Sequence, residues 1–118
     1  MFSVKVEGNF SSAHNLRGYK GKCEALHGHN WKIELVAASD VPDKTGMVLD
    51  FKYLKMQLNK ILEKLDHKYL NKLPYFKKVS PTSENIAKYI YDSMKVKIPE
   101  TKSVTVWENS ASSATYEE

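Results

Sequence analysis

The chain has few of the residues that constrain a fold covalently or conformationally: one cysteine, four prolines and five glycines among 118 residues. A single cysteine excludes an internal disulfide, so nothing suggests secretion, and a reducing cytoplasm is the expected location. Hydrophobic runs of signal-peptide or membrane-span length are also missing. We therefore expect a soluble, cytoplasmic protein without a membrane partner.

Length and charge narrow the class of protein further. A chain of 118 residues is large enough for one domain with a modest core, and we expect a single domain over residues 1–118. The net charge is +4, but most lysines fall at positions expected on the solvated face of a helix. The sequence therefore predicts no nucleic-acid partner, and a small polyanionic ligand would suit the charge equally well.

The spacing of apolar residues predicts an α+β fold in the order strand, strand, helix, helix, strand, strand, with an antiparallel sheet carrying both helices on one face. Asp50 is a predicted N-cap, and apolar residues at helical spacing follow it as far as Leu65. After a loop through Pro74 to Ser80, the second helix should start within residues 80–84, with Pro81 in its first turn. The expected strands cover residues 2–14, 29–37, 103–108 and 114–118, with a turn at 109–113.

Three of the four histidines lie where a metal site is expected. His27 and His29 are separated by one glycine, so both side chains would project to the same face of an extended strand. His14 ends the preceding strand, and antiparallel pairing would bring it over the other two. Three neutral imidazoles match the ligand set of catalytic zinc, which leaves a fourth position open for water or substrate.

The lone cysteine, Cys23, lies four residues before His27 and has two possible roles. It is either a general base beside the metal or a fourth ligand that closes a structural zinc site. Structural zinc sites are usually rich in thiolates, whereas this chain offers one. A thiol pKa of about 8.5, lowered by a nearby cation, suits a general base, which is the role we favour.

Six short motifs, spread in order along the chain, together carry a family resemblance. They are Phe10-Ser-Ser-Ala-His14, Cys23-x-x-x-His27-Gly-His29-Asn30, Gly46-Met-Val-Leu-Asp50-Phe51, Leu65-Asp66-His67-x-x-Leu70-Asn71, Pro81-Thr-Ser-Glu84-Asn85-Ile86-Ala87 and Val106-Trp-Glu108. As a set they resemble the 6-pyruvoyltetrahydropterin synthase family over essentially the whole chain. Within it, the spacing from Cys23 to His27 is similar to that of the 6-carboxytetrahydropterin synthases of the queuosine (7-deazaguanine) pathway.

The resemblance implies a tunnelling fold, whose subunits assemble through their sheets into trimeric barrels that usually stack as hexamers, with active sites between subunits. It also implies a role for each matching residue. Zn²⁺ would bind His14, His27 and His29, and Cys23 would be the general base. Asp66 and His67 would form a second proton-transfer pair from a neighbouring subunit, Glu108 would anchor the pterin, and Thr82 and Ser83 would help to hold its ring.

The implied activity is that of a zinc-dependent lyase. Such an enzyme converts 7,8-dihydroneopterin triphosphate to 6-carboxytetrahydropterin and releases acetaldehyde and triphosphate. The vicinal hydroxyls of this substrate can chelate an open zinc, and a carboxylate such as Glu108 can accept two adjacent N–H groups from a pterin edge. Arg17, Lys20 and Lys22 lie between His14 and Cys23 and are candidates for contact with the triphosphate.

Three alternatives remain open from the sequence. In the first, the enzyme eliminates triphosphate and forms 6-pyruvoyltetrahydropterin. Glu24 directly follows Cys23, and a further branch of the family uses a glutamate in this neighbourhood to make the folate precursor 6-hydroxymethyldihydropterin. The third alternative is a non-catalytic pterin or purine binder with a structural zinc. The joint presence of Cys23, Asp66 and His67 argues against it, because a binder does not need a proton-transfer set.

Overall fold

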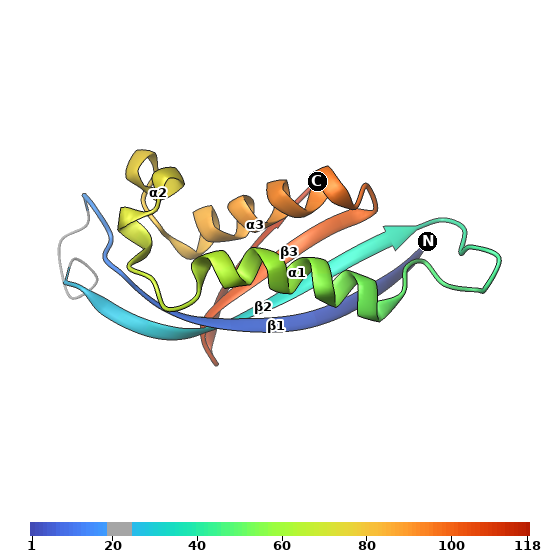
Figure 1. Ribbon diagram of the computed structural model, residues 1–118, viewed down its shortest axis with the longest axis horizontal. Helices are drawn as coiled ribbons and strands as arrows, with labels where there is room; N and C mark the ends of the chain where they lie inside the picture. The colour runs from blue at the N-terminus through green and yellow to red at the C-terminus, as the bar shows by residue number, and fades with distance from the viewer. Residues whose placement is uncertain (19–24) are drawn as a thin grey trace.

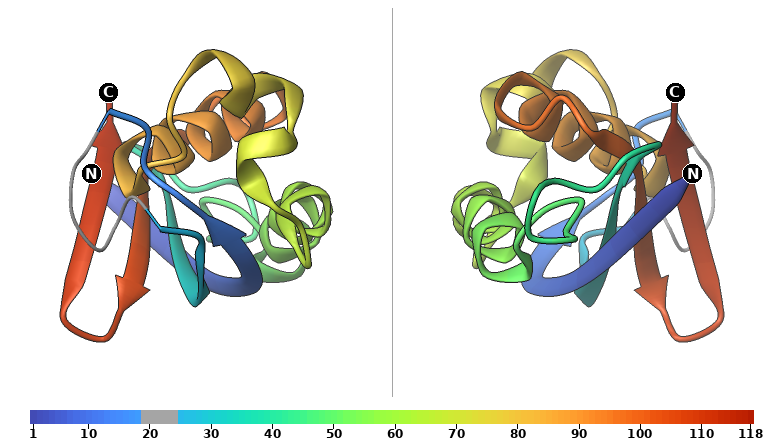
Figure 2. Two further views of the ribbon diagram at one scale, coloured as in Figure 1. Left: turned by 90° about the vertical axis from the view of Figure 1, so that its left-hand side faces the viewer. Right: turned by 90° about the vertical axis from the view of Figure 1, so that its right-hand side faces the viewer.

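The computed structural model describes residues 1–18 and 25–118, and its centre is one antiparallel sheet (Figure 1). The sheet has four strands in the order β1-β2-β3-β4. They are β1 (Phe2–His14), β2 (His27–Ser39), β3 (Thr101–Asn109) and β4 (Ser112–Glu117). The helices all lie on one face of this sheet, as the two end-on views in Figure 2 show. The predicted sheet and the predicted one-sided helical layer are confirmed.

Two long helices and two short ones form this layer: α1 (Phe51–Leu65), η2 (Leu70–Lys72), α2 (Pro74–Lys78) and α3 (Ser83–Lys97). Asp50 is the N-cap of α1, as predicted, and its carboxylate accepts a hydrogen bond from the Lys52 N–H at 2.8 Å. Thr82 caps α3 in the same way, accepting from the Asn85 N–H at 3.1 Å. In residues 1–18 and 25–118 no helix has the length and apolarity needed to cross a membrane.

Four details of the sequence prediction are wrong. Pro81 precedes the Thr82 cap instead of lying in the first turn of α3. The loop expected through Pro74 to Ser80 contains α2, and η2 precedes it; these helices bury Phe76 and Leu70 but are too short to produce a helical period. The second strand extends two residues further at each end than 29–37. The final turn is tighter than 109–113, because the Asn109 side chain accepts from the Ala111 N–H at 2.8 Å and closes it early.

The core is built on the face of β1 and β2 that the helices cover. Phe10 pairs with Trp31 and Gly8 with Ile33 across the two strands, and Trp31 and Ile33 are fully buried. A methyl group added to Gly8 would lie 2.7 Å from Cδ1 of Leu62, so α1 packs directly onto the strand at this glycine. The helix therefore approaches β1 closely only because that position has no side chain.

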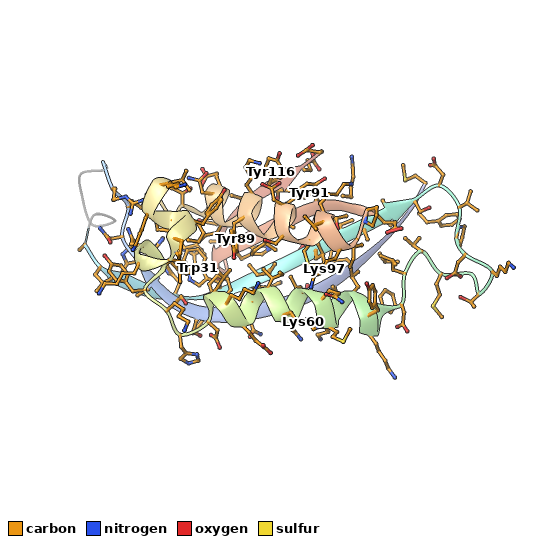
Figure 3. All side chains as sticks on the ribbon, turned by 45° about the horizontal axis from the view of Figure 1, so that its top comes forward. Trp31, Lys60, Tyr89, Tyr91, Lys97 and Tyr116 are labelled. Atoms are coloured by element: carbon orange, nitrogen blue, oxygen red, sulfur yellow. The ribbon has the colours of Figure 1, made fainter. Side chains whose placement is uncertain are left out.

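On the same face of the sheet, but towards its other edge, α3 covers β3 and β4. The rings of Tyr91 on α3 and Tyr116 on β4, both labelled in Figure 3, meet edge to face with centroids 5.0 Å apart. Trp31, also labelled there, lies further along the same layer, between the sheet and the helices. The buried row that contains Trp31 continues along β2 to His29 and His27, so the core leads directly into the candidate site.

Candidate metal centre

The pairing of β1 with β2 gathers the three predicted histidines. In this register His14 is opposite His27, and His29 is opposite Ser12, two residues before His14. Because side chains alternate along a strand, all three imidazoles lie on the helix-covered face. Their ring centroids are 4.6 Å (14 to 27), 5.3 Å (14 to 29) and 4.8 Å (27 to 29) apart. The predicted proximity of the three histidines is confirmed.

A fourth side chain, Glu108 of β3, joins this cluster. Its Oε1 lies 2.9 Å from Nε2 of His29 and 3.5 Å from Nε2 of His14. Each of the four residues offers one ligand atom, and these four atoms all lie within 4.8 Å of one another. Sequence reasoning assigned Glu108 to the pterin substrate and did not predict its contact with the histidines. Its position follows from the pairing of Lys32 with Trp107, a register that joins segments about 75 residues apart and that no local pattern reveals.

Hydrogen bonds to the backbone fix which nitrogen of each ring is free. Nδ1 of His14 lies 2.7 Å from the Pro81 carbonyl oxygen, and Nδ1 of His27 lies 2.7 Å from that of Ala25. A carbonyl only accepts, so each Nδ1 carries the proton and donates it. In the neutral rings both Nε2 atoms therefore present lone pairs, and these two atoms are 3.0 Å apart. Two facing lone pairs repel one another unless a cation lies between or beside them.

The third imidazole also lacks a partner where a metal would bind. Nε2 of His29 is buried and makes no hydrogen bond, because the nearby Glu108 oxygen lies outside hydrogen-bonding geometry. A buried polar atom without a partner is costly in a native protein and calls for a specific explanation. Together with the two facing lone pairs, it makes the donor set fit a metal ion bound through three Nε2 atoms.

The electrostatic environment keeps these imidazoles in the form that binds metal. Burial lowers the pKa of His14 below its ordinary value of 6.5, and His27 and His29 add to this effect against the opposing Pro81 carbonyl and Glu108. Burial likewise lowers the pKa of His29, with Glu108 acting in the opposite direction. Near pH 7 both rings are therefore neutral, so a metal would not have to displace protons from them.

Trp31 forms a rigid wall behind the cluster. Its ring meets those of His14 and His29 edge to face, with centroids 4.9 Å and 5.1 Å away. The indole N–H donates to the Ser12 carbonyl at 3.2 Å, which holds the ring in place. A fully buried tryptophan fixed in this way limits the rotation of both imidazoles.

Asp66 and His67 are in contact at the end of α1, away from the histidine cluster of the same chain. Oδ2 of Asp66 lies 2.9 Å from Nδ1 of His67, at the end of α1. Oδ1 of Asp66 accepts from the Ser11 N–H at 2.8 Å on the outer edge of β1, and this bond, supported by the contact with His67, holds the pKa of Asp66 below its usual range. The His67 side chain is 83% exposed. Within the part of the chain that the structure describes, no hydrogen bond or ion pair joins this pair to the histidine cluster.

The remaining predicted residues divide between described and undescribed parts of the chain. Thr82 caps α3 and Ser83 is the first residue of that helix, directly after the Pro81 carbonyl that contacts His14. Arg17 donates to the carbonyl of Phe76, so this candidate for triphosphate contact lies against α2. Cys23 and Glu24, together with Lys20 and Lys22, lie outside the described residues.

Comparison with known proteins agrees with this geometry. A family model described as 6-pyruvoyl tetrahydropterin synthase matches residues 3–118. A 6-carboxy-5,6,7,8-tetrahydropterin synthase from a Synechocystis species is 38% identical, over 98% of this chain and 93% of its own length. The 6-pyruvoyl tetrahydrobiopterin synthase of Homo sapiens is also 38% identical, over 75% of this chain and 63% of its own length.

The fold agrees as well. The structure of the Caenorhabditis elegans 6-pyruvoyl tetrahydropterin synthase superimposes with a TM-score of 0.90 at 28% sequence identity, covering 99% of this chain and 95% of that one. A family model that spans nearly the whole chain and a relative 38% identical over 98% of it lead to one conclusion. The chain belongs to the 6-pyruvoyl tetrahydropterin synthase family.

Proposed function

We propose that this chain is a zinc-dependent 6-carboxytetrahydropterin synthase. It converts 7,8-dihydroneopterin triphosphate to 6-carboxytetrahydropterin and releases acetaldehyde and triphosphate. The observation that carries the proposal is the cluster of three imidazoles with converging Nε2 atoms on the helix-covered face. Relatives that bear the 6-carboxytetrahydropterin synthase name align over most or all of both chains, which favours this product over the alternatives.

The proposed zinc ligands are His14, His27 and His29. When bound there, zinc would act as a Lewis acid toward the vicinal hydroxyls of the substrate side chain and so acidify the adjacent C–H. The residues around the ligands orient them: the Pro81 and Ala25 carbonyls hold the rings of His14 and His27 by Nδ1. Trp31 limits the rotation of the His14 and His29 rings. Such outer hydrogen bonds fix both the tautomer and the direction of a metal-binding histidine.

The proposed proton-transfer groups are Cys23 and the Asp66–His67 pair. Cys23, as thiolate, removes the acidified proton of the substrate side chain. Oδ2 of Asp66 accepts from Nδ1 of His67, which leaves Nε2 of this ring free to take or give a proton. Because His67 is exposed at the edge of its own subunit, we assign this pair to the active site of a neighbouring chain.

Glu108 has two possible roles beside the histidines. As the pterin anchor, its carboxylate accepts from the 2-amino group and N3–H of the substrate, while Thr82 and Ser83 at the start of α3 contact the ring. As a fourth ligand, it would close the metal site, since Oε1 lies 2.9 Å from Nε2 of His29. We favour the anchor, because three ligands leave the open position that this chemistry needs.

A runner-up function is the elimination of triphosphate to give 6-pyruvoyltetrahydropterin. The close superposition on the Caenorhabditis elegans structure favours it, since that protein bears the corresponding name. A folate-type cleavage to 6-hydroxymethyldihydropterin depends instead on Glu24, which stands next to Cys23. The three functions differ in product and not in fold, so only product analysis separates them.

The metal centre can be tested by comparing two histidine variants. Wild-type protein should contain about one zinc per chain, and His27→Ala should lose both metal and activity, because it removes one of three ligands. His67→Ala is the matched control: it also lacks one imidazole but should keep its zinc. Elemental analysis measures both. Wild-type protein that stays fully active after exhaustive chelation would refute the metal centre.

The role of Glu108 can be tested with Glu108→Gln, which keeps size and removes the negative charge. As an anchor, the variant should raise the KM for the pterin substrate about 10- to 100-fold, the usual value of a charge-assisted hydrogen bond, with zinc content unchanged. Glu63→Gln, at an exposed position on α1, should change neither quantity. Loss of zinc at constant KM would identify Glu108 as a metal ligand instead.

The reaction itself can be tested with Cys23→Ala and Glu24→Ala. Each variant is incubated with 7,8-dihydroneopterin triphosphate, and the products are identified by mass spectrometry. Cys23→Ala should retain zinc but lose roughly two to four orders of magnitude in turnover, as expected for a positioned base. Glu24→Ala should affect formation of 6-carboxytetrahydropterin far less. If Cys23→Ala is nearly normal and Glu24→Ala is inactive, the folate function replaces the one proposed.

The assembly can be tested by subunit mixing. We expect trimers or hexamers, because β4 and residues 2–10 of β1 have no neighbouring strand on their outer edges within the described residues, and a second chain commonly covers such edges. Inactive Cys23→Ala and His67→Ala subunits, dissociated and reassembled together, should then recover part of the activity. A mixture of Cys23→Ala and Cys23→Ser subunits should not recover it. An active monomer in sedimentation would contradict the shared site.

A further inference from the structure

Residues 65–71, which we call the strap, run along the outer edge of the last part of β1. The Ser11 carbonyl accepts from the His67 N–H at 2.6 Å, and the Ala13 N–H donates to the Lys68 carbonyl at 3.0 Å. The hydroxyl of Ser12, which is buried, donates to the Leu65 carbonyl and accepts from the Lys68 N–H. The strap thus covers the edge of β1 immediately before the metal-ligand candidate His14.

The strap continues past the end of the strand through the side chain of Asn71. Its Oδ1 accepts from the Asn15 N–H at 3.0 Å, and its Nδ2 donates to the Asn15 carbonyl at 2.9 Å. Asn15 also makes a third hydrogen bond with this segment, since the Tyr69 hydroxyl donates to Oδ1 of Asn15 at 2.5 Å. Asn71 is 9% exposed, so water has little access to compete with these bonds.

The Asn71 side chain holds the backbone where β1 ends, directly after His14. β1 ends at His14, and the sheet ladder no longer holds the chain at Asn15. The ends of strands tend to fray, whereas a metal ligand must be held within a fraction of an ångström. Asn71 takes the place of a neighbouring strand at this point, since one amide both accepts from and donates to the same residue. The backbone is therefore fixed on both sides of His14, at Ala13 and at Asn15.

We propose that Asn71 is a positioning residue for His14 and that it preorganises the three-histidine cluster for its metal. The inference depends on the proposed metal centre and deepens it. Asn71 does not touch the imidazoles; it acts only by fixing the backbone at Asn15. Aspartate, although nearly the same size, cannot fill this role, because its carboxylate would face the Asn15 carbonyl with no proton to donate.

The experiment measures zinc affinity of the folded protein by competition with a chromophoric chelator, with circular dichroism to verify that each metal-free variant is folded. Asn71→Asp should weaken zinc binding roughly 10-fold, the lower end of the loss caused by removing a group that bonds directly to a metal ligand, because Asn71 acts through the backbone at Asn15. Asn59→Asp, the same change at an exposed position on α1, should leave the affinity unchanged. Tyr69→Phe should weaken binding in the same direction by a smaller factor, and it replaces Asn71→Asp if that variant does not fold.

A destabilising variant elsewhere separates positioning from a general loss of stability. Ile98→Val removes one buried methylene group at the end of α3 and should lower the free energy of unfolding of the metal-free protein while leaving its zinc affinity unchanged. Asn71→Asp should instead weaken zinc binding in the folded protein. An unchanged affinity in folded Asn71→Asp, or an equal loss of affinity in Ile98→Val, would overturn the inference. Failure of the wild-type protein to bind zinc would instead refute the metal centre itself.

Discussion

The register between β1 and β2 is the constraint on which both the fold and the site depend. It pairs Phe10 with Trp31 in the core and His14 with His27 at the end of the sheet. Because strand side chains alternate, a slip of one residue would move the apolar row into solvent and would turn the histidines to the opposite face. The free energy of core packing therefore also positions the imidazoles, and no separate device is needed to choose their face.

The core residues and the histidines lie in one row on the helix-covered face of β2, and this explains the low polarity around the imidazoles. The core along β2 ends at Trp31, and the next inward-facing position is His29. The histidines thus inherit the low polarity of the neighbouring core, which lowers the pKa of His14 and His29 by burial. Their remaining polarity is satisfied by carbonyls on one side of two of the rings and is left open on the side where the Nε2 atoms converge.

Much of this architecture was predictable from local pattern, and the failures have a common physical cause. Alternation predicted β1 and the proximity of the three histidines, and a capping carboxylate predicted the start of α1. Two contacts of the cluster that sequence reasoning missed join distant segments: Glu108 reaches the cluster through the β2–β3 register, and Pro81 reaches His14 across 67 positions. Short helices such as α2 were missed because five residues carry too little periodicity. Contacts of Cys23 lie outside the described residues.

The backbone conformation at His67 links the stability of one subunit to the chemistry proposed for its neighbour. This residue has a φ of 54°, a left-handed conformation that costs a side-chain-bearing residue about 1 kcal/mol or more and that glycine would adopt freely. The turn at this point leaves the imidazole projecting from the subunit while Asp66 still holds its Nδ1. In the proposed assembly, each chain thus gives up some of its own stability to equip another chain's chemistry. A single subunit would carry that cost without using the imidazole in its own chemistry.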